Sequence, residues 1–152
     1  LHLQCHFGMD TMSWARLGAK ETGVDFSDPA IALDRSLSNE LAIDVRFVDP
    51  NVYDLSENLE GQLDIVFTSY GARYWLPDLP AWARIVAHFL KPGGVFYVVD
   101  GHPSGHMLGG KRSDSLVVQY PYFNSDEPMP SKPDRKGDYA DETAIATKAE
   151  CG

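Results

Sequence analysis

Short runs rich in β-branched and aromatic residues alternate with amphipathic helical patterns over residues 1–100 of this chain. Such alternation is typical of parallel strands joined by helices, because a parallel strand needs a long crossover connection. The chain has 152 residues, of which 43% are hydrophobic, and this is enough for one domain with a substantial core. We therefore expect an α/β protein with a Rossmann-like, doubly wound and mostly parallel sheet.

The expected strands cover residues 1–4, 21–26, 44–49, 63–70 and 95–100. A first helix is expected to be capped by Asp10 or Thr11 and to end at Gly18. A second helix starts at Ser27, and its expected apolar stripe at helical spacing consists of Ala30, Leu33, Leu37 and Leu41. A third helix runs from Asp78 to Gly93, with Leu79, Trp82, Val86 and Phe89 on one face.

The sequence changes in character after Pro103. "SLVVQYPYF" can form one more strand or half a hairpin, and the residues from Asn124 onward are polar and poorly patterned. We predict a core domain over residues 1–103, followed by a loop, a lid strand and a mobile polar tail over residues 104–152. The sheet is expected to be incomplete at its C-terminal edge, and an unpaired edge strand favours self-association. Because the chain lacks an initiating Met, we expect it to be a truncated fragment.

Charge and cysteine usage limit the partners and the setting. A net charge of −9 disfavours nucleic acid as a partner, because that binding needs clustered Lys and Arg. No apolar run reaches the roughly 20 residues of a membrane span, so no membrane partner is expected. Cys5 and Cys151 lie at opposite ends of the chain, which favours a reducing, cytoplasmic compartment.

The residues after each strand are the candidates for binding, because ligands of open parallel sheets lie beyond the carboxyl ends of the strands. Asp25 follows Gly8 at close to the spacing of roughly 20 residues at which an acidic side chain binds ribose hydroxyls. Its alternative role is to cap the next turn. The side-chain carbonyl of Asn51 can accept a hydrogen bond from an adenine amino group, or Asn51 is an ordinary loop residue.

These features together resemble a class I S-adenosylmethionine-dependent methyltransferase. They are the glycine after the first strand, the acidic residue after the second, the polar residue after the third, and "LKPGG" before the fifth. In "LKPGG", Pro92 ends a helix and the following glycine pair makes a tight turn. "LHLQCHFGMDT", "FTSYG" and "WLPDL" resemble a bacterial subgroup of that family, and the resemblance covers residues 1–103.

The resemblance implies S-adenosylmethionine as cofactor and a small-molecule methyl acceptor. The residues that it implies for cofactor binding are Gln4, Cys5, His6, Gly8, Asp25, Phe26, Asn51, Val52, Thr68 and Ser69. Tyr70 and Trp75 are candidate aromatic walls for the sulfonium, or else packing residues. His102, just past the fifth strand, is the candidate base, and Tyr70 is the second candidate catalytic residue; the alternative for His102 is an ordinary loop histidine.

The sequence also departs from the family pattern. The usual loop reads acidic-x-Gly-x-Gly-x-Gly, and here these positions hold His2, Gln4, His6 and Gly8. Either the loop follows an altered path or the cofactor affinity is reduced, because glycine permits positive φ and close approach to a ligand. The amides at the start of the first helix are suited to binding a carboxylate, and we interpret Asp10 there as a cap rather than a ligand.

Other chemistries are weaker alternatives. Cys5, His6, His102 and His106 are potential metal ligands, but adjacent residues rarely point at one ion, so no metal is expected. A nucleophilic Cys5 lacks a base partner in the sequence. Beside the methyltransferase, a non-catalytic nucleotide-binding module or an inactive methyltransferase fragment stays open. A dinucleotide-dependent oxidoreductase is disfavoured, because Gly-x-Gly-x-x-Gly is absent.

Overall fold

The computed structural model describes residues 1–108, 117–118 and 120–123. The chain forms two compact units, Leu1–Gly105 and His106–Gly152, and the sheet belongs to the first. In the second unit, Leu108 and Val118 form an antiparallel bridge. The predicted lid strand over residues 115–123 lies partly outside the described residues, and the predicted polar tail over residues 124–152 lies wholly outside them.

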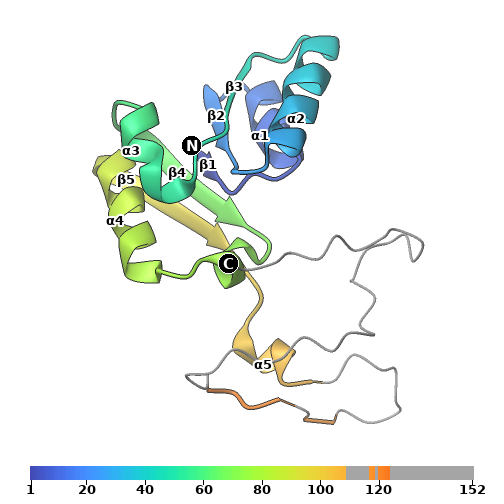
Figure 1. The fold of residues 1–152 in the computed structure, drawn as a ribbon, viewed down its shortest axis with the longest axis vertical. Helices are drawn as coiled ribbons and strands as arrows, with labels where there is room; N and C mark the ends of the chain where they lie inside the picture. Colours follow the sequence, from blue (N-terminus) through green and yellow to red (C-terminus); the bar gives the residue numbers. More distant parts are fainter. Residues whose placement is uncertain (109–116, 119, 124–152) are drawn as a thin grey trace. The chain divides into compact units, whose positions relative to one another are not determined.

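Five parallel strands form one sheet in the order β3-β2-β1-β4-β5 (Figure 1). They are β1 (His2–Leu3), β2 (Glu21–Val24), β3 (Val45–Val48), β4 (Leu63–Ser69) and β5 (Leu90–Val99). The direction of the strand order reverses between β1 and β4, which is where ligands bind in such sheets. This architecture confirms the predicted Rossmann-like α/β fold.

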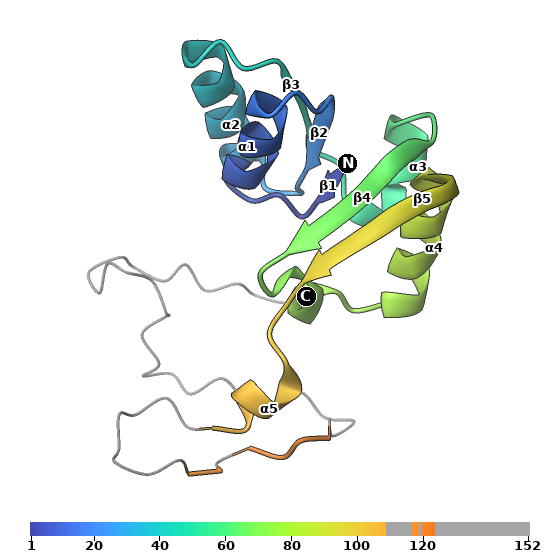
Figure 2. The same cartoon turned by 180° about the vertical axis from the view of Figure 1, so that it is seen from behind.

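Helices cover both faces of the sheet (Figures 1 and 2). On one face lie α1 (Met9–Arg16) and α2 (Asp28–Glu40), and on the other lie α3 (Leu55–Asn58) and α4 (Leu79–Phe89). Shorter helical segments are η1 (Val52–Asp54), η2 (Ala72–Trp75) and α5 (Pro103–His106). No helix in the described part of the chain is both long enough and apolar enough to cross a membrane.

Two separate apolar clusters pack between the sheet and these helices. Under α3 and α4 the buried cluster contains Leu1, Leu3, Val24, Val52, Leu55, Leu59, Val66, Trp82, Val86 and Phe89. Under α1 and α2 the buried cluster is smaller and contains Cys5, Met12, Ile31 and Phe47. Successive strand residues point to opposite faces, so Leu3 belongs to the first cluster while its neighbour His2 faces α1. The smaller cluster includes a residue of the loop after β1.

The helix α4 forms largely as predicted. Asp78 caps it, because its carboxylate accepts a hydrogen bond from the Ala81 N–H at 2.8 Å. Trp82, Val86 and Phe89 are buried, whereas Leu79, the fourth residue of the expected face, is 44% exposed. The helix ends at Phe89, before Pro92 and short of the predicted end at Gly93, because Leu90 already pairs with Leu63 of β4.

Two predictions for the other helices are wrong. The helix α1 begins at Met9 with Gly8 as its N-cap, so Asp10 lies in the first turn and is not the cap. The buried face of α2 consists of Ala30, Ile31, Asp34 and Ser38, while Leu33 and Leu41 of the predicted stripe are exposed. The burial of Ser38 is possible because its hydroxyl donates to the Arg35 carbonyl at 3.1 Å within the helix. Ser27 is the N-cap residue, as predicted, but makes no side-chain cap.

Both faces of β5 are partly exposed, and on the α4 side Phe96 and Val98 are 39% and 44% exposed. On the α4 side, Trp82 packs edge-on against Phe96 at 5.6 Å between ring centroids. On the α1 side, Ile65, Val95 and Tyr97 are each about half exposed. Within the described residues β5 pairs only with β4, so it forms an edge of the sheet. Self-association through this edge stays a prediction.

Candidate functional site

The loop after β1 has a left-handed backbone at three positions. The φ angles are 54° at Gln4, 48° at His6 and 50° at Gly8. Gln4 and His6 thus adopt the conformation that glycine favours, at a cost of roughly 1–2 kcal/mol each. The replacement of the expected glycines does not move these residues out of the left-handed region. Gln4 is already part of this loop, which is why β1 is shorter than predicted.

Asp25 holds this loop in place. Its buried carboxylate accepts hydrogen bonds from the backbone N–H of His6 at 2.8 Å and from that of Ser27 at 3.0 Å. The loop is fixed further by the Cys5 N–H, which donates to the Val24 carbonyl at 2.9 Å. Asp25 therefore caps the turn that follows it and also ties the loop after β1 to the end of β2. Each carboxylate oxygen retains a second acceptor site for a ligand.

Gly8 lies where no side chain fits. A Cβ at this position would come within 2.6 Å of the Phe47 ring and 2.9 Å of the Asp34 carboxyl carbon. Gly23 on β2 faces the same ring, and a Cβ there would lie 2.7 Å from it. The Phe47 ring from β3 thus fills the space beneath the loop, and the closeness of backbone and ring requires both glycines.

Two ionisable groups are buried at this loop, Cys5 within it and Asp34 of α2 beside Gly8. Burial raises the pKa of the Cys5 thiol, and Asp25 and Asp34 raise it further, so the thiol stays protonated. Burial, followed by the charge of Asp25, raises the pKa of Asp34 to about 6. Asp34 Oδ2 has no hydrogen-bond partner among the described residues. A protonated, buried thiol makes Cys5 unsuited to nucleophilic chemistry.

A polar network centred on His2 was not predicted from the sequence. The buried imidazole contacts Thr11 Oγ1 of α1 through Nδ1 at 2.8 Å and Ser69 Oγ at the end of β4 through Nε2 at 3.3 Å. Ser69 Oγ in turn lies 3.5 Å from Asp10 Oδ2. Burial lowers the pKa of His2 to about 4, so the ring is neutral near pH 7. His2 therefore connects α1 to β4 without bringing a charge.

The predicted binding residues Gln4 and Thr68 contact each other. Thr68 Oγ1 donates to Gln4 Oε1 at 3.2 Å, and Thr68 is buried. Gln4 Nε2 is also buried and has no partner among the described residues. An unsatisfied buried donor is costly unless another group, such as a ligand oxygen, accepts from it.

The predicted cofactor-binding residues Phe26, Asn51 and Val52, of which Asn51 was predicted for the adenine, lie in different surroundings. Asn51 is exposed, and its side-chain carbonyl accepts from the Tyr53 N–H at 3.0 Å, which caps η1. Val52 is buried in the larger apolar cluster, whereas Phe26 is 74% exposed. The Asn51 carbonyl is therefore already engaged in a local cap, with one acceptor site left.

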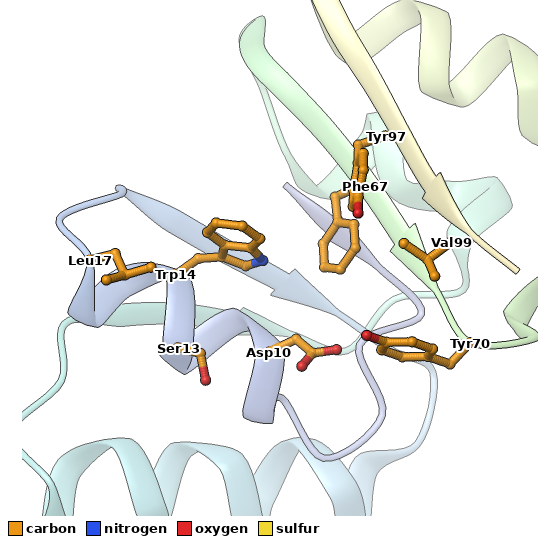
Figure 3. A pocket seen from close by; sticks show the side chains of 8 residues that line it. All are labelled: Asp10, Ser13, Trp14, Leu17, Phe67, Tyr70, Tyr97 and Val99. Atoms are coloured by element: carbon orange, nitrogen blue, oxygen red, sulfur yellow. The ribbon is translucent and has the colours of Figure 1, made fainter.

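A pocket of about 190 Å³ lies between α1 and the ends of β4 and β5 (Figure 3). Its lining consists of Asp10, Ser13, Trp14, Leu17, Phe67, Tyr70, Tyr97 and Val99. Tyr70 follows β4 with a φ of 55°, and its side chain is directed toward Asp10 (Figure 3). Of the two predicted aromatic walls, Tyr70 lines this pocket and Trp75 does not.

His102 lies apart from this pocket lining. It is exposed, and its Nδ1 contacts Ser104 Oγ at 2.8 Å and accepts from the Ser104 N–H at 3.3 Å. Just before it, Asp100 Oδ2 accepts from Arg73 Nε at 2.6 Å, which ties the end of β5 to η2. Within the described residues, no three His, Cys, Asp or Glu side chains are grouped so that they could hold a metal ion.

Comparison with known sequences decides the family. The sequence profile described as "Methyltransferase domain" matches residues 1–96. The chain belongs to the methyltransferase domain family. This confirms the predicted resemblance to a methyltransferase, while the bacterial subgroup and the roles of individual residues in this methyltransferase domain stay predictions.

Curated relatives agree with this assignment. The ubiquinone biosynthesis O-methyltransferase of Xanthomonas euvesicatoria is 33% identical over 98 residues, which cover 64% of this chain and 41% of that protein. The ubiquinone biosynthesis O-methyltransferase of Pseudoalteromonas translucida is 23% identical over 154 residues, which cover 100% of this chain and 65% of that protein. The chain thus spans well under half of the first relative.

Two solved structures share the fold of this methyltransferase domain. The PH0226 protein of Pyrococcus horikoshii matches with a TM-score of 0.63 and 22% identity, covering 70% of this chain and 50% of that one. The glycopeptide N-methyltransferase MtfA, solved with sinefungin, matches with a TM-score of 0.58 and 21% identity. The match covers 64% of this chain and 44% of the MtfA chain.

Proposed function

We propose that this methyltransferase domain takes part in S-adenosylmethionine-dependent methyl transfer to a small-molecule acceptor. The observation that carries the proposal is the loop after β1. Its residues Gln4, His6 and Gly8 are left-handed, the His6 N–H donates to Asp25, and the loop leaves β1 beside the point where the strand order reverses. Membership of the methyltransferase family supports the same function.

The residues around the loop fit such a cofactor. The carboxylate of Asp25 has acceptor sites left for ribose hydroxyls, and Gln4 Nε2 is a buried donor suited to a carboxylate oxygen. We propose that Cys5, His6, Gly8, Thr68 and Ser69 line the cofactor through the backbone and short polar groups. Phe26, Asn51 and Val52 are proposed for the adenine. When bound, S-adenosylmethionine supplies an electrophilic methyl group on a sulfonium.

The protein's contribution to such a displacement is mainly positioning and, for a protonated nucleophile, a proton acceptor. Tyr70 lies at the end of β4, beside Ser69 and on the wall of the pocket, so we propose that it orients the acceptor. His102 stays the proposed base. Its Nδ1 accepts from the Ser104 N–H, so in the neutral ring Nε2 carries the hydrogen, and Nδ1 must release this contact before it can take a proton. A cytoplasmic setting also stays a prediction.

Calorimetric titration tests the cofactor. We expect S-adenosylmethionine and S-adenosylhomocysteine to bind the whole chain, and we expect Asp25→Asn to weaken both by at least about tenfold, as loss of charge-assisted hydrogen bonds does. Asp44→Asn, a change at an exposed carboxylate, is the matched control and should leave binding unchanged. No heat at millimolar concentration of either compound would contradict the proposal.

A second candidate is a binding module without catalysis. It is favoured by the position of His102, which is exposed and outside the pocket lining. Turnover separates the two functions. S-adenosylhomocysteine produced in the presence of a metabolite pool indicates the enzyme, and binding of the cofactor without product indicates the module.

A further inference from the structure

We propose that the pocket between α1 and the ends of β4 and β5 binds a small organic cation, an ammonium group on an apolar body, as the methyl acceptor. The role as acceptor rests on the proposed methyl transfer, whereas binding of the cation does not. The argument depends on the aromatic lining, on the single charge in it, and on the place of the pocket in the strand order.

Aromatic side chains from three elements surround the pocket. Trp14 of α1, Phe67 of β4, Tyr70 after β4 and Tyr97 of β5 all line it (Figure 3). The Phe67 ring is fixed at their centre, 4.2 Å from His2, 5.6 Å from Tyr97 and 6.5 Å from Trp14 between centroids. The negative faces of such rings attract cations, which is the basis of quaternary ammonium recognition.

Asp10 supplies the charge. It is the one ionisable acid or base among the pocket-lining residues apart from the tyrosines, and within the described residues it forms no ion pair. Asp10 Oδ2 lies 3.5 Å from Ser69 Oγ, and Ser69 Oγ also contacts Nε2 of the neutral His2 imidazole. No cationic side chain pairs with the carboxylate within the described residues, and the N-terminus of α1 offers it only a partial positive charge. Figure 3 shows the carboxylate directed toward Tyr70 at the side of the pocket. A cation in the pocket would provide the missing charge.

The strand order separates this pocket from the proposed cofactor residues. Asp25 and Asn51 follow β2 and β3, on one side of β1, whereas the pocket is built on β4 and β5, on the other side. The two regions meet at Ser69 and Tyr70. A ligand in the pocket would thus approach the end of β4, where the resemblance places the methyl donor.

Size and chemistry limit the ligand further. The volume of about 190 Å³ is below the range of drug-sized pockets, so the apolar body is one ring or a short branched chain against Leu17 and Val99. Methyl transfer to such an amine forms an N–C bond and breaks the S–C bond of the sulfonium, which leaves a neutral thioether. Because a bound ammonium has no lone pair, the nitrogen must release one proton before it attacks the methyl group, and Asp10 is an acceptor for that proton within the pocket.

The test uses two probes of similar shape, 2-phenylethylamine, which is a cation at pH 7, and 2-phenylethanol, which is neutral. Titrated calorimetrically into the whole chain, the amine should bind about tenfold more tightly than the alcohol. Asp10→Asn should abolish this preference and leave alcohol binding in place, while Asp44→Asn should change neither. Equal affinity for both probes, or a preference that survives Asp10→Asn, would overturn the proposal.

Two further measurements keep the result decisive. The ratio of amine to alcohol affinity is measured on the unmodified chain, so it tests the proposal even if Asp10→Asn fails to fold. In that case Tyr97→Leu replaces Asp10→Asn as the test variant, and it should weaken binding of the amine about threefold or more because the pocket loses one ring. Repeating the amine titration with saturating S-adenosylhomocysteine distinguishes acceptor from cofactor. Retained amine binding supports an acceptor site, and competition assigns the pocket to the cofactor and overturns the proposal. Failure of S-adenosylhomocysteine alone to bind would contradict the proposed function, not the cation site.

Discussion

The loop after β1 and the turn after β4 both contain non-glycine residues with a left-handed backbone, but different contacts hold each of them in place. Both leave the carboxyl edge of the sheet through non-glycine residues at positive φ, Gln4 and His6 in the first and Tyr70 in the second. The first is tied down by Asp25 and packed over the Phe47 ring. The turn is held by its backbone, with the Tyr70 N–H donating to Val99 at 2.7 Å, while the Tyr70 side chain is 75% exposed.

This difference separates two uses of a strained backbone. In the loop after β1 the strain is offset by buried contacts with Asp25 and Phe47, and we propose that the backbone held in this way is the surface that binds the cofactor. In the turn after β4 the strain directs one large side chain to the edge of a pocket. We expect the loop to respond to substitutions through stability and the turn to respond through ligand affinity.

The largest expected effect comes from filling the space beneath the loop. Gly8→Ala places a Cβ within 2.6 Å of the Phe47 ring at a φ of 50°. Overpacking and the left-handed backbone together should lower the free energy of unfolding by about 4 kcal/mol. Urea unfolding followed by circular dichroism measures this.

Gly18→Ala is the matched control for this change. Gly18 also has a positive φ, of 97°, but nothing lies within 4 Å of its Cβ position. Gly18→Ala should lower the free energy of unfolding only through the strain of a left-handed alanine, by about 1 kcal/mol. Equal losses for the two variants would mean that the Phe47 contact does not constrain the loop.

The next effect is a pH dependence through His2, which links the two regions. Its pKa in the folded chain, about 4, lies below the ordinary value of 6.5, so between these values the unfolded chain binds more protons. The contribution of His2 to stability is thus full above pH 6.5 and is lost as the pH falls toward 4, by roughly 3 kcal/mol. Denaturant midpoints measured from pH 7 to pH 4 should show this slope.

His2→Gln is the control for the pH dependence. Asp34 has a raised pKa of about 6, so its own contribution falls as the pH rises from 3.8 to about 6 and opposes that of His2 over the shared range. Subtracting the stability profile of His2→Gln from that of the unmodified chain isolates the histidine. A difference that does not vary with pH would refute a neutral, buried imidazole.

Removal of the Asp25 carboxylate should loosen the loop after β1 and leave the turn after β4 intact. Asp25→Ala deprives the N–H groups of His6 and Ser27 of their acceptor, which should cost about 2 kcal/mol. Amide hydrogen exchange at His6 should accelerate, while that of Tyr70 should not change. Asp49→Ala, at an exposed carboxylate paired with Arg35 at 3.5 Å, should cost under about 0.5 kcal/mol.

The smallest expected effect is a gain in stability. His6→Gly removes an exposed side chain from a residue with a φ of 48°, and it should stabilise the fold by roughly 0.5 kcal/mol after the greater freedom of glycine in the unfolded chain is included. Tyr70→Gly relieves the same strain, but it should also weaken amine binding because the pocket loses a ring. A Tyr70→Gly variant with unchanged amine affinity would remove the distinction between the two regions.

Local signals in the sequence predicted the elements well. The alternation of apolar runs and helical patterns was enough for the parallel sheet, and Asp78 identified the start of α4. Such features depend on residues within a few positions of one another. Asp25 was identified by its spacing from Gly8 and lies directly after β2, while its role in cofactor binding stays a prediction.

Contacts between distant segments were the part that the sequence did not reveal. The start of α1 is set by Gly8, whose conformation fits the Phe47 ring, so Asp10 was misplaced as a cap. The buried face of α2 includes Asp34, a polar residue that apolar periodicity does not identify. His2, Thr11 and Ser69 meet only because β1 pairs with β4, so an isolated histidine in an apolar strand gave no signal of the network.

The Phe47 ring has a consequence for how this chain can evolve. It lies against the backbones of Gly8 and Gly23, so three positions on a loop and two strands share one volume. An alanine at either glycine is incompatible with the ring, and a smaller residue at position 47 would leave a void unless a glycine changed with it. We therefore expect these three positions to covary among descendants of this sequence, with the aromatic residue as the last to be replaced.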